Sequence, residues 1–260
     1  MKHYAYDSPF NMVDKEGNKY LLTVKQDEMP ESPREWENVA TMICWHNRYD
    51  LGDQHNFDYS FEFLLDIAKE IGIYTEDMEE MTNNELLVKI QSSNLIVILP
   101  INLYDHSGIT ISTSNDYPYN DRWDAGCVGF AYIIKEKAFK ELREYVVDDN
   151  GERIKVEHKH ENMPSTWSYK TQPLTNATWK KRAIEVINTE VEIYDQYLRG
   201  DVYGYILEKE EVVKETCPHC GEVISSATEM IEEDSCWGFY GDCLEENGIL
   251  DNVYGLKFID

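Results

Sequence analysis

The stretch Leu95-Ile96-Val97-Ile98-Leu99 is fully apolar, which predicts a strand buried on both faces in the middle of a sheet. Two downstream runs fit the same sheet. Residues 109–113 alternate like a half-buried strand, and Gly126 to Ile134 is a further β-favouring run. The short apolar run from Val39 to Trp45 adds another expected strand.

Apolar residues at helical spacing separate these strands and follow them. Thr82 and Glu85 form a capping-box pattern at the start of one such segment. Strands in succession with helices inserted irregularly are typical of an α+β domain. We therefore expect an α+β fold with a mainly antiparallel sheet and several packed helices, which should cover residues 60–71, 82–92, 135–146 and 176–198.

The two ends of the chain predict further strands. Residues 10–13 and 19–24 flank a Gly-containing turn and are typical of a hairpin. Residues 202–207 and 235–240 are expected short strands, with an acidic insertion at 208–234 between them. The polar stretch 148–173 has no strong period, so we expect a surface excursion that could contain a small hairpin. The whole chain, residues 1–260, is interpreted as a single domain.

The composition excludes several classes of protein. The chain carries 50 Asp and Glu against 24 Lys and Arg, a formal charge of −26, which argues against direct nucleic-acid binding through a basic face. Hydrophobic residues make up 42% of the chain, too much for a disordered acidic tail. The longest apolar stretch, from Leu95 to Leu103, is too short to span a membrane. These features predict a folded protein without a membrane partner, located in the cytoplasm.

Most of the charge lies in two blocks. Residues 50–100 have a net charge of −9 and residues 201–260 a net charge of −12. Solubility needs far less, so one interpretation is a negative surface that meets a positive partner. The other is an acidic proteome, as in a salt-adapted host, or drift on solvated faces. The residues expected to bind the partner are Glu208, Glu210, Glu211, Glu229, Glu232 and Glu233.

The segment Cys217-Pro218-His219-Cys220-Gly221 matches a zinc knuckle, in which a tight turn lets both thiolates face one metal ion. A structural zinc site needs four ligands. The candidates for the other two are His219, Cys236 and Cys243, although a second CxxC is absent from the sequence. An ordinary reduced turn is the alternative, and a redox role is a third.

A second group of residues suggests chemistry. His46 and Asp53 lie in one expected loop, and Asp105 and His106 lie in another. A hydrolase-like enzyme could use either histidine as a general base and either carboxylate to orient it. The structural alternative is a buried loop in which Arg48 pairs with Asp50 or Asp53. No phosphate-binding glycine loop, nucleophile elbow or HExxH motif occurs in the sequence.

Several short motifs occur together between residues 30 and 243. They are Pro33-Arg34-Glu35-Trp36-Glu37-Asn38, residues 41–53 (TMICWHNRYDLGD), Tyr104-Asp105-His106-Ser107-Gly108, Trp123-Asp124-Ala125-Gly126, Val128-Gly129-Phe130, residues 192–198 (EIYDQYL), Gly200-Asp201-Val202-Tyr203-Gly204 and residues 234–241 (DSCWGFYG). In this order they resemble a family of acidic proteins of unassigned role that phages, prophages and plasmids carry.

The resemblance implies a genetic setting more than an activity. Small acidic proteins of phages and plasmids often block host defences, some by presenting carboxylates where a nuclease expects phosphates. The expectation is therefore an anti-defence protein in the host cytosol that inhibits a nuclease, restriction or CRISPR-type complex, either as a DNA mimic or by enclosing the complex. A cytosolic enzyme and an accessory phage assembly protein, which could form homo-oligomers, are the alternatives.

Overall fold

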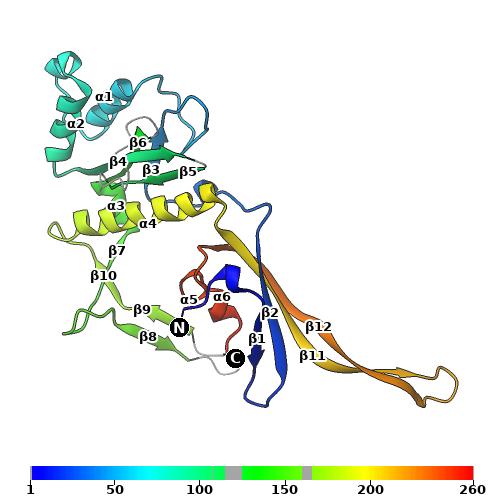
Figure 1. Cartoon of the computed structure of the whole chain (residues 1–260). Helices are drawn as coiled ribbons and strands as arrows, with labels where there is room; N and C mark the ends of the chain where they lie inside the picture. The colour runs from blue at the N-terminus through cyan, green and yellow to red at the C-terminus, as the bar shows by residue number, and fades with distance from the viewer. Residues whose placement is uncertain (1, 107, 115–124, 160–165, 260) are drawn as a thin grey trace. The chain divides into compact units, whose positions relative to one another are not determined.

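The computed structural model describes residues 2–106, 108–114, 125–159 and 166–259 (Figure 1). The fold is α+β, with 28% helix, 39% strand and antiparallel sheets, as the sequence predicts. Where the sequence suggests one domain, the chain divides into two compact units. Unit 1 comprises Met1–Glu35 and Ile193–Asp260, and unit 2 comprises Trp36–Glu192.

Unit 2 is built on a four-stranded antiparallel sheet in the order β3-β6-β4-β5. Strand β4 contains most of the apolar run from Leu95 to Leu99, and it lies between two partners, as that run predicts. The bounds of the four strands are β3 Thr41–Cys44, β4 Ile96–Asp105, β5 Ile109–Ser112 and β6 Ala125–Ile134.

Helices α1 (Ser60–Glu70) and α2 (Asn83–Ser92), with the 3₁₀ helix η3 (Glu76–Glu80), cover one face of this sheet (Figure 1). The predicted capping box is confirmed, because Thr82 and Glu85 exchange side-chain and backbone hydrogen bonds at the start of α2. The core between the helices and the sheet contains Ile43, Phe63, Leu64, Ile67, Ala68, Met78, Leu86, Ile90, Ile96, Ile98 and Phe130.

Helix α3 (Lys135–Glu141) is shorter than the predicted 135–146. Leu142 adopts an extended conformation, and the chain continues as β7 (Arg143–Tyr145), which pairs with β10 (Thr171–Pro173). Within the expected polar excursion, β8 (Lys155–His158) pairs with β9 (Thr166–Tyr169), and both strands are exposed.

Helix α4 (Trp179–Arg199) is the longest helix described, and its residues fall in both units. Within unit 2 its buried residues Trp179, Ala183 and Ile187 follow helical spacing. Glu190 fixes the helix to the start of β3, since its carboxylate accepts hydrogen bonds from the backbone N–H groups of Val39 and Ala40 at 2.9 and 3.1 Å.

Unit 1 contains a five-stranded antiparallel sheet in the order β12-β11-β2-β1-β13. The predicted N-terminal hairpin is confirmed as β1 (Phe10–Val13) and β2 (Lys19–Gln26), and β13 comprises Lys257–Phe258. Short helices η1 (Ala5–Asp7), η2 (Pro33–Glu35), α5 (Leu244–Asn247) and α6 (Ile249–Asn252) complete the unit. Its core contains Ala5, Met12, Tyr20, Leu22, Val24, Tyr205, Leu207, Leu244, Ile249 and Val253.

The last two strands of this sheet differ from the prediction. Strand β11 spans Val202–Thr216 and β12 spans Val223–Tyr240, so residues 208–234 are the outer part of one hairpin and not an insertion between two short strands. Backbone pairing, with register shifts at Leu207/Glu208 and Glu215/Thr216, and β-favouring pairs such as Val212-Val213 and Val223-Ile224 extend the strands through the acidic sequence.

Across the part of the chain that the structure describes, no helix combines the length and the apolar content needed to cross a membrane.

The close approach of β3 and β6 gives a test of the unit 2 sheet. A Cβ atom added at Gly129 would lie 2.1 Å from the carbonyl oxygen of Ile43, whereas one added at Gly126 on the same strand meets nothing within 4 Å. Gly129→Ala should therefore lower the free energy of unfolding by about 1–3 kcal/mol because the strands must separate. Chemical denaturation measures the change. Gly126→Ala is the control, and equal effects of both substitutions would contradict this packing.

Candidate functional site

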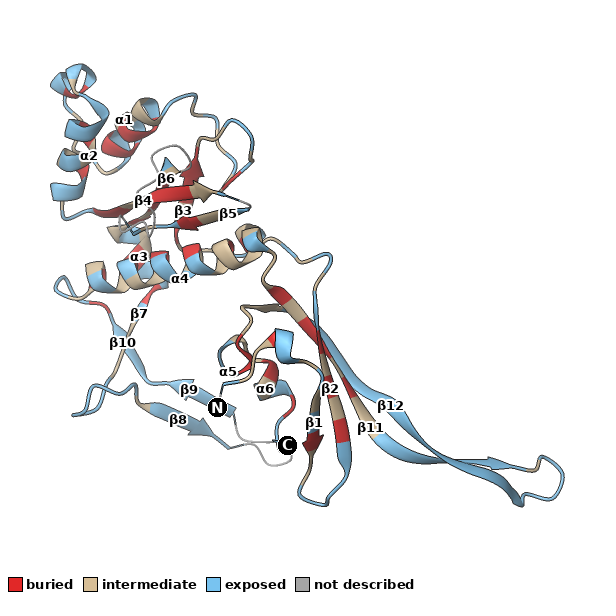
Figure 2. Ribbon diagram, in the orientation of Figure 1, coloured by how far each residue is buried: buried red, intermediate tan, exposed pale blue. Residues whose placement is uncertain are grey.

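The most distinctive surface of unit 1 is the outer part of the β11–β12 hairpin, residues 208–234, which we call the arm. Strand β2 pairs with β11 only as far as Lys209, opposite Tyr20. Beyond that point the described residues place no third strand beside the arm. Every arm residue from Glu210 onward is exposed except Cys217, which is half-buried (Figure 2). The arm is therefore a two-stranded ribbon whose shape depends on its own cross-strand contacts.

Like charges face each other across this ribbon. Glu208 is directly opposite Glu232, and Glu211 is directly opposite Glu229. Residues directly opposite in an antiparallel pair share a face and interact, so two carboxylates in that position destabilise the hairpin. Because 208 and 211 differ by an odd number of residues in β11, the two pairs lie on opposite faces of the ribbon. The arm thus carries carboxylate pairs on both of its faces.

Few positive charges balance these acids. The arm contains nine acidic residues and two lysines, a net charge of −7. Glu210 pairs with Lys19 of β2 at 3.4 Å, and the Ser235 hydroxyl donates to Glu232 at 2.9 Å. Both contacts are at the surface, where an ion pair contributes at most about 1 kcal/mol. The arrangement costs stability locally, which identifies the glutamates as candidates for a contact with another molecule.

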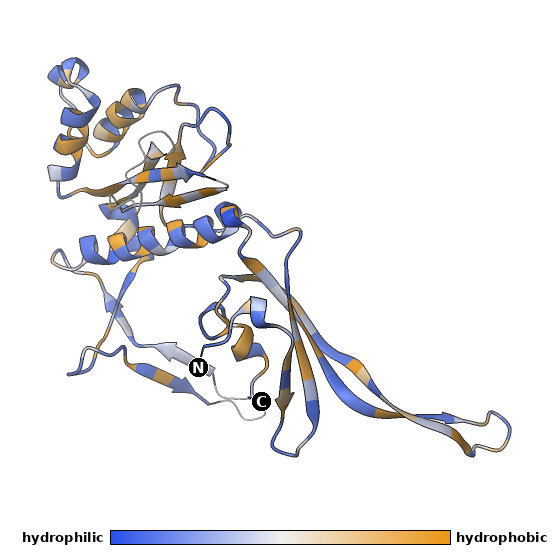
Figure 3. Cartoon of the chain, viewed as in Figure 1, coloured by the Kyte–Doolittle hydropathy of each residue, from blue (hydrophilic) through white to orange (hydrophobic). Residues whose placement is uncertain are grey.

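The charge is concentrated near the base of the arm. Residues 208–211 and 227–234, which we call the acidic root, contain seven acids and one lysine. Residues 212–226, which we call the tip, have a net charge of −1 and include hydrophobic positions, orange in Figure 3. Val212 and Ile224 of the tip are 61% and 62% exposed. The arm therefore carries most of its charge at the root and is nearly neutral at the tip.

The tip ends in the predicted cysteine turn. The backbone N–H of Cys217 donates to the Glu222 carbonyl at 2.8 Å, and that of Gly221 donates to the Cys217 carbonyl at 2.9 Å. Gly221 has φ +74°, a conformation that glycine adopts without strain. Hydrogen bonds from the backbone N–H groups of Cys220 and His219 to the sulfur lower the pKa of the Cys217 thiol. The lowered pKa favours the thiolate form of Cys217 over that of an ordinary cysteine.

The other candidate zinc ligands are placed differently from the prediction. Cys236 is opposite Tyr205, thirteen residues along β12 from Val223, which is roughly 40 Å at 3.3 Å per residue. Cys243 is buried beyond the other end of β12. Neither can join Cys217 and Cys220 around one metal ion within the same chain. Among the described residues, no group of three or more His, Cys, Asp or Glu side chains could hold a metal.

In unit 2 the structure brings together the two loops singled out in the sequence. Arg48 forms an ion pair with Asp105 at the end of β4, and the Tyr49 hydroxyl lies 3.4 Å from the same carboxylate. Arg48 therefore pairs across the loops with Asp105. The structural interpretation of the sequence, in which Arg48 pairs with Asp50 or Asp53, is wrong on this point. The Asp105 side chain is only 18% exposed, so this contact fixes the loop that follows β3.

Each of the two histidines contacts neighbouring residues of its own segment. The Nδ1 atom of His46 accepts hydrogen bonds from the backbone N–H groups of Arg48 and Tyr49, both at 3.3 Å, and its ring stacks on Tyr49. Of the described residues, none that contacts His46 offers it a carboxylate. His106 is exposed and stacks on Tyr104. Ser107 of the same motif lies outside the described residues, as do Trp123 and Asp124.

Asp53 and His55 both bind the backbone of β3. Asp53 accepts a hydrogen bond from the Met42 N–H at 2.8 Å, and its own N–H donates to the Met42 carbonyl at 2.7 Å. His55, which the sequence does not single out, bonds to the Cys44 carbonyl at 2.9 Å. These contacts satisfy the exposed edge of β3, which explains why polar residues recur in this loop.

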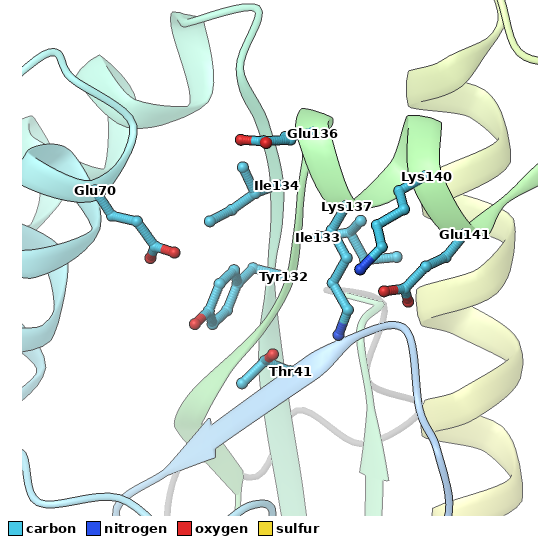
Figure 4. A pocket seen from close by; sticks show the side chains of 9 residues that line it. All are labelled: Thr41, Glu70, Tyr132, Ile133, Ile134, Glu136, Lys137, Lys140 and Glu141. Atoms are coloured by element: carbon cyan, nitrogen blue, oxygen red, sulfur yellow. The ribbon is translucent and has the colours of Figure 1, made fainter.

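A hollow of about 380 Å³ lies in unit 2 beside β3, β6 and α3 (Figure 4). Glu70 and Tyr132 point into it, and burial raises the pKa of both groups, that of Tyr132 to about 12. The lining also includes Glu136, Glu141, Lys137 and Lys140. Three carboxylates and two ammonium groups line the hollow, so it selects neither sign of charge.

No family model, curated protein or solved structure matches this chain. The residues and their arrangement therefore carry the functional inference.

The opposed glutamates give a test of the arm's electrostatics. Glu229→Lys converts the pair with Glu211 from repulsive to attractive, which should stabilise the arm by about 0.2–1 kcal/mol. Amide hydrogen exchange near positions 211 and 229 should slow by roughly 1.4- to 5-fold.

Glu215→Lys is the matched control, because Glu215 is opposite Ser225 and accepts a hydrogen bond from its hydroxyl. This substitution makes the same change in charge without relieving a repulsion. Exchange that is unchanged or faster in Glu229→Lys would show that the carboxylate pair does not strain the hairpin.

Proposed function

We propose that this chain is an anti-defence protein of a phage or mobile element, which inhibits a nucleic-acid-handling complex of the host through the acidic root. The observation that carries the proposal is the pair of directly opposed glutamates on each face of an exposed ribbon. An arrangement that costs stability in the free protein is favourable when a positive partner neutralises it.

The partner's chemistry follows from the shape and charge of the root. A protein that binds nucleic acid has a groove of Lys and Arg, whose affinity for phosphates comes largely from counterion release. A narrow ribbon with carboxylates on both faces can enter such a groove and contact two walls. Long-range attraction would speed the encounter, and salt would weaken the complex. The ribbon therefore favours imitation of the nucleic acid over enclosure of the complex.

The carboxylates of the second acidic block, residues 50–100, differ from those of the root in their contacts, and this difference favours the root as the partner surface. Several of its carboxylates have partners within unit 2. Glu85 belongs to the capping box, Asp77 pairs with Lys89 at 3.4 Å, and Tyr74 donates to Glu79 at 2.6 Å. These acids stabilise local structure, whereas those of the root oppose one another. The root is accordingly the better candidate for the partner surface.

The enzyme alternative receives less support. Its four candidate residues make contacts within the fold. His46 and Asp53 accept hydrogen bonds from backbone N–H groups. Asp105 forms an ion pair with Arg48, and His106 stacks on an aromatic ring. An accessory assembly role makes a different prediction, because its partner would be a phage protein and nucleic acid would not compete for it.

The direct test is reversal of the charge of the root. A variant with Glu208, Glu210, Glu211, Glu229, Glu232 and Glu233 changed to Lys should keep its fold, because exposed charges contribute little to stability. It should lose the partner that the immobilised native chain captures from host lysate at low salt. Duplex DNA should displace that partner from the native chain, and the native chain should inhibit its activity on nucleic acid.

The matched control changes six exposed acids of unit 2 to Lys, namely Asp66, Glu76, Glu80, Glu136, Glu141 and Asp149. This variant has the same net charge as the first and should still bind and inhibit. His46→Ala and His106→Ala should also leave inhibition unchanged. The proposal fails if both sixfold variants bind equally, or if DNA does not compete.

A further inference from the structure

The cysteine turn at the tip offers half of a metal site. Cys217 and Cys220 are separated by two residues in a turn that backbone hydrogen bonds close at both ends. Gly221, at φ +74°, ends this turn directly after the second cysteine. Structural zinc sites take four ligands, most often thiolates and imidazoles. The turn by itself supplies two thiolates.

The rest of the same chain does not complete this shell. Cys236 is roughly 40 Å away along β12, and Cys243 lies beyond the far end of that strand. His219 and Glu222 flank the cysteines, but among the described residues no three His, Cys, Asp or Glu side chains form a group that could hold a metal. The two missing ligands must therefore come from another molecule, and the exposed tip is open to one.

We propose that two copies of this chain share one Zn²⁺ ion, held by Cys217 and Cys220 of each copy. Two identical tips related by a twofold axis supply four thiolates, which is a complete tetrahedral shell. Each thiol loses its proton on binding, so formation of the site releases protons and weakens as the pH falls.

The surface around the turn suits a second copy. The tip has a net charge of only −1, so two tips can approach with little repulsion. Val212, Val223 and Ile224 are each more than half exposed, and a second tip would cover them. The nearest glutamate of the acidic root, Glu211, is six residues from Cys217, roughly 20 Å along the strand. The root therefore stays outside the shared site, and this inference does not depend on the proposed partner.

The experiment uses the full chain, treated with a chelator and kept in a reductant that prevents disulfides. Light scattering after size exclusion measures its mass before and after addition of Zn²⁺, and elemental analysis measures bound zinc. We expect the mass to double, with one zinc ion for two chains, and a chelator should reverse both changes. Cys217→Ser and Cys220→Ser should each remove the zinc and the dimer.

Cys236→Ser, which removes another exposed thiol of the same hairpin, is the control and should behave like the native chain. A thermal melt of each variant confirms that it is folded. One zinc ion per chain in a monomer would overturn the proposal, and so would a dimer that persists without zinc or in Cys217→Ser. Failure of either kind leaves the test of the acidic root unaffected, because that test measures a different surface.

Discussion

The structure of the arm depends on the residue at which β2 stops pairing with β11. Up to Lys209 the hairpin is part of a five-stranded sheet with a buried face, and beyond it only β11 and β12 remain. A two-stranded ribbon cannot bury a core, so its side chains are free to differ from those of a sheet that must fold by burial. This constraint explains why so many charges and exposed apolar residues occur in one continuous segment.

The two surfaces of the arm follow from the same constraint. Carboxylate pairs are tolerated at the root because the sheet of unit 1 anchors the hairpin there. At that anchor Tyr205 is buried, and its hydroxyl donates to Asp234. The tip is farthest from this support, and its turn is closed by backbone hydrogen bonds and by the conformation of Gly221. The sheet of unit 1 therefore stabilises the root, whereas the tip depends on its own turn.

Local patterns in the sequence predict most of unit 2. The apolar run at Leu95 to Leu99 and the capping box at Thr82 act through neighbouring residues, and both predictions are confirmed. Helix α3 ends earlier than its pattern suggests because the chain after Leu142 pairs with a strand from far along the sequence. The ion pair between Arg48 and Asp105 likewise joins residues that only the sheet brings together.

The arm is harder to predict from the sequence, because its acidic composition argues against strands while its backbone pairing favours them. The opposition of Glu211 and Glu229 depends on the hairpin register, which composition does not determine. The cysteine turn is visible in the sequence, but spacing alone does not show that Cys236 lies far along β12. The sequence thus identifies the acidic and cysteine residues, and the register determines which of them can act together.

Hydrogen exchange of the chain, free and bound to the partner it captures, tests the role of the acidic root most directly. Binding through the root should slow exchange at residues 208–211 and 227–234 and leave the sheet of unit 2 unchanged, because carboxylates on both faces of the ribbon would be covered. Slowed exchange that is confined to unit 2, with none in the arm, would contradict the account.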